Sequence, residues 1–212
     1  MLRVFGAVLF GLVRVLVRTA LRPVVTGVDR LPAAATLVTP NHVSYLDPLV
    51  IAAALPWRRL RRTYWAGWVG VMHTSPLRRL VSRAAQVFPV DPDRDLAAAV
   101  RTARGLLDRG YDVVWFPEGR RSPTGELQSF EGGVGVLAKG VTAAAVPAAI
   151  DGTFAAWPKH RRWPRVARVR VAFGAPVDIA GVEQPAEIRT TLEGAVRRLL
   201  AELCAPGADR AS

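Results

Sequence analysis

The chain has 212 residues, half of them hydrophobic, and a single cysteine. This length suits one domain with a sizeable core, and a lone cysteine excludes an intramolecular disulfide. Lys and Arg outnumber Asp and Glu by 29 to 17, a net charge of +12, so the surface should attract nucleic acid, anionic lipid headgroups or phosphorylated ligands. We expect Cys204 to be a small core residue of the last helix rather than a nucleophile.

Residues 1–22 predict an amphipathic helix. The unbroken apolar run Val4–Val13 is shorter than the roughly 20 residues that a membrane span requires. Four basic residues lie within an arc of roughly 100° on such a helix: Arg3, Arg14, Arg18 and Arg22. The pattern favours a helix lying in the membrane interface with its guanidiniums at anionic headgroups. The alternative is a helix that packs on its own domain and leaves these arginines in water.

From Pro23 onward, short β-rich runs alternate with helical runs, which predicts an α/β fold with a largely parallel, mixed sheet. Expected strands are Val24–Val28, Thr36–Thr39, Thr63–Ala66, Gln86–Val90, Val113–Phe116, Ala145–Ile150 and Val166–Phe173. Expected helices are Pro48–Leu55, Pro76–Ala84, Leu96–Arg109, Gly133–Lys139 and Pro185–Cys204. We therefore predict one domain over residues 23–204, followed by a disordered polar tail over 205–212. Trp65 and Trp68 suit either the core or a headgroup boundary.

The stretch TPNHVSYLDPLV combines His42 with Asp47 and Pro48. In a continuous helix the two titratable side chains would diverge by about 140°. Pro48 suits the first helical position and Asp47 the N-cap, which leaves His42 in the turn after a strand. A folded-back turn would set the carboxylate against one imidazole nitrogen and leave the other as a general base. Alone, this short motif has a substantial risk of chance occurrence.

A second stretch, VVWFPEGRRSPTGEL, runs from a buried strand into a charged loop. Loops at the carboxyl ends of strands are where α/β folds bind ligands. Arg120 and Arg121 offer forked donors suited to phosphate, and Gly119 lets backbone N–H groups approach it. Glu118 has two possible roles, holding an arginine or bonding a substrate hydroxyl. The competing interpretation is a solvated charged turn.

Three blocks in this order resemble the 1-acylglycerol-3-phosphate acyltransferase family of glycerolipid acyltransferases. They are HVSYLD at His42–Asp47, FPEGRRS at Phe116–Ser122 and VPAAI at Val146–Ile150. The resemblance spans residues 30–175. It implies that His42 removes the proton of an acceptor hydroxyl as its oxygen attacks the thioester of acyl-CoA or acyl-carrier protein. It also implies that Asp47 holds His42 and that no acyl-enzyme forms.

The resemblance further implies a lysophospholipid acceptor, with 1-acylglycerol-3-phosphate giving phosphatidate. The residues expected to bind it follow two strands: Arg94, Phe116, Pro117, Glu118, Gly119, Arg120, Arg121 and Ser122. Val146 and Pro147 resemble a segment associated with the acyl donor, although a buried strand explains them equally well. No bound cofactor or metal is expected, since three scattered histidines and one cysteine make no ligand set.

The sequence departs from the family pattern at three places. Pro92 stands where an arginine is common, with Arg94 two places later, Arg120 replaces a threonine, and Glu131 replaces a lysine. These departures leave open another lipid acceptor, a glycolipid or an amino-lipid. A non-catalytic membrane- or nucleic-acid-binding protein is the remaining alternative, although no nucleic-acid-binding signature is present. We expect the cytoplasmic face of the plasma membrane as the location and its anionic surface as a partner.

Overall fold

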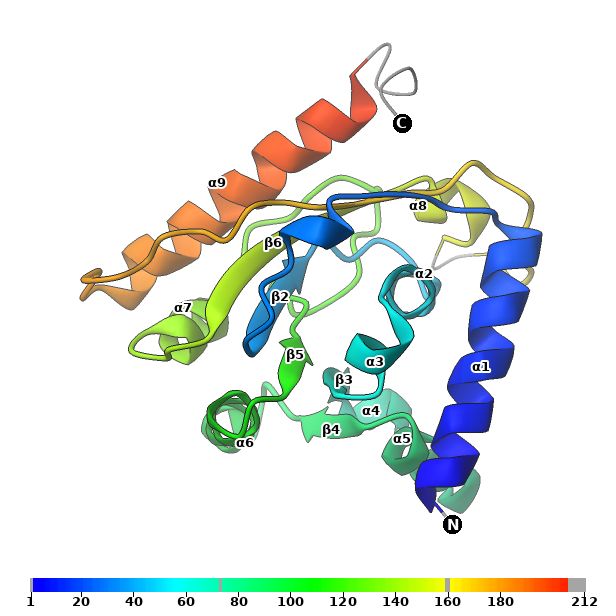
Figure 1. Cartoon of the computed structure of the whole chain (residues 1–212), viewed down its shortest axis with the longest axis horizontal. Helices are drawn as coiled ribbons and strands as arrows, with labels where there is room; N and C mark the ends of the chain where they lie inside the picture. The colour runs from blue at the N-terminus through cyan, green and yellow to red at the C-terminus, as the bar shows by residue number, and fades with distance from the viewer. Residues whose placement is uncertain (1, 73, 159–160, 206–212) are drawn as a thin grey trace.

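The computed structural model describes residues 2–72, 74–158 and 161–205. A seven-stranded mixed sheet of order β1-β7-β6-β2-β5-β3-β4 organises them (Figure 1). Neighbouring strands are parallel except β6 and β7, which are antiparallel. The strands are β1 (Val24–Thr26), β2 (Thr36–Pro40), β3 (Thr63–Trp68), β4 (Val87–Val90), β5 (Asp112–Val114), β6 (Ala144–Asp151) and β7 (Arg170–Phe173).

Helices cover both faces of this sheet (Figure 1). They are α1 (Leu2–Ala20), α2 (Asp47–Ala54), α3 (Trp57–Leu60), α4 (Val69–Met72), α5 (Pro76–Ala84), α6 (Leu96–Asp108), α7 (Gly132–Ala138), α8 (Thr153–Ala156) and α9 (Pro185–Cys204), with a 3-10 turn at Val28–Arg30. The predicted α/β class and largely parallel sheet are confirmed. The predicted bounds of α5 and α9 are those observed. The last strand was predicted too long, because β7 starts only at Arg170.

Two apolar cores lie on opposite faces of the sheet. Leu37 and Val113 belong to the core under α6, α7 and α9, whereas their successors Val38 and Val114 belong to the core under α1 and α2. All four side chains are at most 1% exposed. Because side chains alternate along a strand, two consecutive valines or leucines bury both faces at once, as parallel sheets require. The central strands are therefore fixed from both sides, and the loops at their ends carry the polar residues.

Helix α1 buries Phe10 and Val17, and two of its arginines reach the carboxyl end of α2. Arg14 donates to the carbonyl of Leu55, and Arg18 Nε donates to the carbonyl of Ala53 at 3.1 Å. These carbonyls end α2, where unpaired C=O groups attract cations. The expectation that Arg14 faces headgroups is therefore wrong. Arg18 and Arg22 are exposed, so for them the expectation stays a prediction, and the side chain of Arg3 lies outside the described residues.

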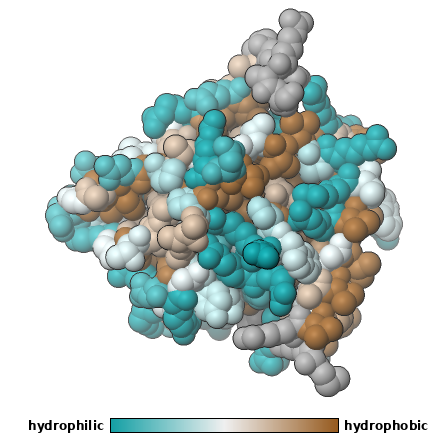
Figure 2. All heavy atoms as spheres, viewed as in Figure 1, coloured by the Kyte–Doolittle hydropathy of each residue, from teal (hydrophilic) through white to brown (hydrophobic). Residues whose placement is uncertain are grey.

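Apolar side chains occupy the outward face of α1, as Figure 2 shows along the right of the molecule. They are Val4, Phe5, Val8, Leu12, Val15 and Leu16, each between 44% and 68% exposed. Within the described residues, no helix has the length and apolarity needed to cross a membrane. At the other end of the chain, Cys204 is exposed, contrary to expectation, because its neighbour Leu203 takes the inward position on α9.

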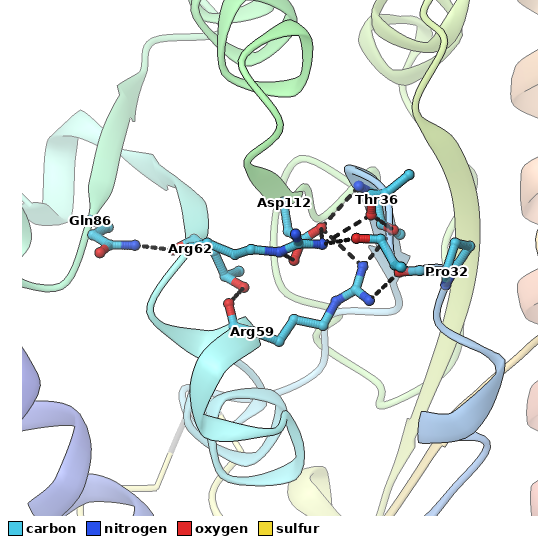
Figure 3. Close-up of polar contacts among 9 residues, drawn as sticks. Pro32, Thr36, Arg59, Arg62, Gln86 and Asp112 are labelled. Carbon is cyan, nitrogen blue, oxygen red and sulfur yellow. Dashed lines mark hydrogen bonds and ion pairs between the residues drawn. The ribbon is translucent and has the colours of Figure 1, made fainter.

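The amino ends of β2, β3 and β5 are joined by a buried ion-pair cluster (Figure 3). Asp112 accepts from Arg59 at 2.9 Å, from Arg62 at 3.1 Å and from the backbone N–H of Thr36 at 2.9 Å. Arg59 also donates to the carbonyl of Pro32. Asp112 is 1% exposed, so these donors replace the water it loses on folding. The cluster fixes the start of three neighbouring strands.

Candidate active site

The two charged blocks meet at the opposite, carboxyl edge of the sheet. β2 and β5 are parallel neighbours with Val38 opposite Val114, so the chain leaves both strands at the same edge. The backbone N–H of Ser122 donates to the carbonyl of His42 at 2.8 Å. The loop after β2 and the loop after β5 are thus hydrogen-bonded to each other, and the predicted residues of the two blocks lie side by side.

His42 and Asp47 form a directed pair. The imidazole Nδ1 lies 2.8 Å from Asp47 Oδ2. Because a carboxylate only accepts hydrogen bonds, Nδ1 carries the proton and Nε2 keeps its lone pair. The Asp47 side chain is fully buried, whereas that of His42 is 19% exposed. The contact fixes the ring through Nδ1 and leaves Nε2 as the nitrogen that can accept a proton.

The turn that produces this pair differs by one residue from the predicted one. The N-cap of α2 is Leu46, and Asp47 is the first helical residue. Asp47 Oδ2 accepts from the backbone N–H groups of Val43 at 2.6 Å and Ser44 at 2.7 Å. The carboxylate therefore points back into the loop instead of forward to the helix, and the N-cap assignment was wrong while the folded-back turn was right.

Two residues whose hydrogen bonds support this turn, Thr153 of α8 and Asn41, were not predicted from the sequence. Thr153 Oγ1 donates to Asp47 Oδ1 at 2.6 Å, so both carboxylate oxygens are paired. Asn41 bonds both backbone groups of Ile150, donating to its carbonyl at 2.9 Å and accepting from its N–H at 2.7 Å. Both contacts join residues more than a hundred positions apart, and no local pattern indicates them. The residue type of Asn41, a polar side chain between a strand and His42, was the only available signal.

Glu118 lies behind His42 and is 1% exposed. One oxygen accepts from the backbone N–H of His42 at 2.5 Å, and the other from that of Gln128 at 3.0 Å. Burial raises the pKa of Glu118 to about 7, although both N–H donors oppose the shift. The carboxyl thus connects the loop of the base to the loop after β5. Phe116 packs against the imidazole, with ring centroids 4.2 Å apart.

Arg121 lies over the ring of Tyr45, with its guanidinium carbon 3.4 Å from the ring centroid. Its Nη1 is buried and has no hydrogen-bond partner among the described residues. A desolvated N–H without an acceptor is costly, so this nitrogen is well suited to an anionic oxygen supplied by a ligand. Tyr45 belongs to the first block, so each block supplies one half of the stacked pair; sequence reasoning missed it.

The other predicted residues occupy different surroundings. Ser122 is buried, and its Oγ accepts from the backbone N–H of Gly125 at 3.1 Å, which shapes the loop. Gly119 has φ +69°, the left-handed region that favours glycine. Arg120 is exposed, and Pro117 accepts from the N–H of Glu131 at 2.7 Å.

Arg94 and the Val-Pro block lie apart from the imidazole. Arg94 is exposed in the turn before α6, where its backbone N–H donates to Asp91. This turn follows β4, three strands from β2, which is about 14 Å across the sheet. Val146 and Pro147 are buried within β6, opposite Val38 and Thr39. In residues 2–72, 74–158 and 161–205, no three His, Cys, Asp or Glu side chains gather as metal ligands.

Comparison with known proteins agrees with this geometry. The sequence matches the family described as Acyltransferase over residues 22–151. The chain belongs to the acyltransferase family. The match covers β1 to β6, and therefore both loops that meet at His42.

Individual relatives are more distant. Over 141 residues the chain is 25% identical to a 1-acyl-sn-glycerol-3-phosphate acyltransferase of Cocos nucifera, covering 65% of this chain and 44% of that protein. Over 138 residues it is 29% identical to the chloroplastic enzyme of that name from Arabidopsis thaliana, covering 61% and 36%. The chain thus spans less than half the length of these curated relatives.

A solved structure shares the fold. The 1-acyl-sn-glycerophosphate acyltransferase PlsC of Thermotoga maritima superposes with a TM-score of 0.72 at 24% identity, over 97% of this chain and 79% of that one. The single α/β domain with a helix before its first strand is therefore a known arrangement for an acyltransferase.

Proposed function

We propose that this protein transfers a fatty acyl chain from acyl-CoA or acyl-carrier protein to the free hydroxyl of 1-acylglycerol-3-phosphate, giving phosphatidate. The observation that carries the proposal is the His42 imidazole held by buried Asp47 at 2.8 Å, beside a guanidinium with a buried, unpaired N–H. A base and an anion site at one sheet edge suit a phosphorylated alcohol as acceptor. The names of the relatives point to the same acceptor.

The reaction follows from the free Nε2 of His42. This nitrogen takes the proton of the acceptor hydroxyl as the oxygen attacks the thioester carbonyl carbon. A C–O bond forms, the C–S bond breaks, and the imidazolium returns its proton to the leaving thiolate. Asp47 stabilises the imidazolium without itself accepting the proton. The protein supplies no covalent intermediate.

The roles of the second block differ in part from those that the resemblance implies. In our proposal Arg121 binds the acceptor phosphate through Nη1, and exposed Arg120 adds positive charge nearby. Glu118 binds no substrate, because both of its oxygens accept backbone N–H groups. It instead fixes the distance between the base and the phosphate site. Arg94 and the Val-Pro block have no assigned contact with either substrate.

We further propose that the enzyme works on the anionic cytoplasmic face of the plasma membrane, as a peripheral protein held by α1. The support is the exposed apolar face of α1 and the net charge of +12, since apolar burial and attraction to anionic lipids add in interfacial binding. Both substrates carry acyl chains, so a surface location would bring enzyme and lipid together.

One assay tests the reaction and its two open choices. Purified protein receives acyl-CoA or acyl-carrier protein with a labelled chain, and each is offered lysophosphatidate, a glycolipid and an amino-lipid. We expect labelled phosphatidate as the main product, because a phosphate monoester provides the most charge for Arg121. Label on the glycolipid or amino-lipid alone would keep acyl transfer and overturn the acceptor. This second acceptor class is favoured by Pro92, which stands where lysophosphatidate enzymes commonly have an arginine.

A further inference from the structure

Exposed apolar side chains continue beyond α1 onto α5 and the end of β3. Leu77 and Leu80 on α5 are 68% and 47% exposed, and Trp68, the last residue of β3, is 54% exposed. Large apolar side chains gathered on one surface mark an interaction site. The sequence indicated such a surface for residues 1–22, and left Trp68 open between core and boundary.

The apolar stripe of α5 leads directly to α1. A Cβ added to Gly6 of α1 would lie 2.2 Å from the carbonyl oxygen of Ala84 on α5, so the two helices touch there. On an α-helix, Leu77 and Leu80 lie within about 60° of Ala84 and of each other. Leu77 and Leu80 therefore share one side of a helix whose carboxyl end packs on α1. The exposed apolar side chains of α1 and α5 are thus carried by two helices in contact.

The charge of this surface favours anionic lipid. Residues 1–28 and 48–90 contain no Asp or Glu, and these stretches include all of α1, β3, α4 and α5. Arg78, Arg79 and Arg83 on α5 are exposed. Apolar side chains flanked by arginines suit the boundary between acyl chains and anionic headgroups. A symmetric second copy fits less well, because a two-fold contact would bring the same arginines together.

The surface borders the candidate active site. β3 is parallel to β5, and Trp65 pairs with Val114, so Trp68 leaves the sheet at the carboxyl edge that carries His42. The order β2-β5-β3 places it two strands from β2, about 10 Å across the sheet. Helix α4 follows β3 directly, and α5 begins at Pro76. A lipid in a bilayer under Trp68 and Leu77 would be close to the base.

We propose that α1, Trp68 and the Leu77–Leu80 stripe of α5 form one surface that rests on an anionic bilayer beside the active site. That the bilayer supplies the lipid substrate rests on the proposed function. The new element is a second membrane contact, on α5, in addition to that of α1. Two contacts fix the orientation of the protein, whereas one helix leaves it free to rotate. The carboxyl edge of the sheet then faces the lipid.

Sedimentation of the full chain with vesicles tests this surface. Vesicles of phosphatidylcholine, with and without phosphatidylglycerol, are mixed with the wild type and with the double variant Leu77→Asp, Leu80→Asp. We expect the double variant to lose at least about tenfold in partitioning onto phosphatidylglycerol vesicles, since each leucine no longer buries apolar area. The matched control is Val136→Asp on α7, whose side chain is 47% exposed like that of Leu80. It should partition like the wild type.

Several results would overturn the proposal. They are wild-type partitioning of the double variant, equal partitioning onto the two kinds of vesicle, or a lipid-free dimer of the wild type that the double variant lacks. If the double variant does not fold, the same sedimentation experiment is done with Trp68→Ser, for which we expect reduced partitioning onto phosphatidylglycerol vesicles. The measurement requires no turnover, so absence of acyl transfer would refute the proposed function and leave the surface standing.

Discussion

The two ends of the central strands each hold a buried carboxylate, and only one end is suited to chemistry. At the amino ends, Asp112 is 1% exposed and accepts from two guanidiniums. At the carboxyl edge, Asp47 is fully buried and accepts from two backbone N–H groups, a hydroxyl and an imidazole. Burial and full pairing are therefore common to both ends.

The difference lies in the partners. Guanidiniums stay charged at every physiological pH, so Arg59 and Arg62 can only hold Asp112 in place. An imidazole has two nitrogens and an ordinary pKa near neutrality, so His42 can be held at Nδ1 and still exchange a proton at Nε2. A buried, fully paired carboxylate therefore does not by itself indicate a catalytic site. A partner imidazole whose second nitrogen can exchange a proton does.

The largest effect is expected from His42→Ala. Loss of a general base should reduce acyl transfer about a hundredfold to ten-thousandfold. Thermal unfolding should be nearly unchanged, because the side chain is partly exposed and Asp47 keeps its other donors. The check is the initial rate of transfer to lysophosphatidate beside the unfolding temperature. A rate close to that of the wild type would mean that the carboxyl edge of the sheet, like the amino ends of the strands, holds only a structural carboxylate.

Asp112→Ala should have the converse effect. Removing one partner of a buried ion pair costs about 3–5 kcal/mol, because Arg59 stays buried without its counter-ion. We expect that loss in the free energy of unfolding from urea titration, with normal acyl transfer per folded molecule at low temperature. Asp93→Ala, at an exposed position of the turn before α6, is the control and should change stability by less than about 0.5 kcal/mol. Unchanged stability in the Asp112 variant would contradict a structural role.

The sequence predicted the architecture better than the details of these two ends. Helices α5 and α9 have the predicted bounds, and the proline in the first turn of each accounts for the correct start. The four-residue helices α3, α4 and α8 were missed, since one turn shows no periodicity.

At the site, local spacing predicted the pair of His42 with Asp47 but not the supporting contacts. Thr153 reaches Asp47 across 106 positions, and Asp112 reaches Arg59 across 53. Such partners are selected by which strands lie side by side, which single-sequence patterns do not encode. The contacts of Arg14 and Arg18 with α2 were missed for the same reason, because they depend on α1 packing against the carboxyl end of α2.

Glu118 is a third buried carboxyl, and it differs from Asp47 and Asp112 in that its partners within the described residues are only backbone N–H groups, those of His42 and Gln128. Burial raises its pKa from 4.5 to about 7. The folded protein therefore holds a proton that the unfolded chain releases, and this contribution to stability is lost as pH rises from about 4.5 to about 7. The shift corresponds to roughly 3 kcal/mol.

Glu118→Gln tests that contribution, because a glutamine does not titrate. Between about pH 4.5 and pH 7 the stability of the wild type should fall relative to that of the variant. Urea midpoints at several pH values measure the difference in stability between the two proteins. The contributions of the other titrating groups cancel in this difference, because both proteins contain them. Parallel curves would mean that Glu118 is ionised throughout, held like Asp112 as a fixed charge.

The smallest effect is expected at Tyr45, whose ring supports Arg121 at 3.4 Å. This arginine differs from Arg59 and Arg62 in that an aromatic face, instead of a carboxylate, holds it, so its charge remains uncompensated for a substrate. A cation–π contact contributes about 0.5–2 kcal/mol, so Tyr45→Ala should raise the KM for lysophosphatidate about threefold to thirtyfold with little change in kcat. Tyr45→Phe keeps the ring and should restore the wild-type KM. If both variants raise KM equally, the hydroxyl matters and the stacking does not; if Tyr45→Ala lowers kcat alone, the ring acts on His42 rather than on the phosphate site.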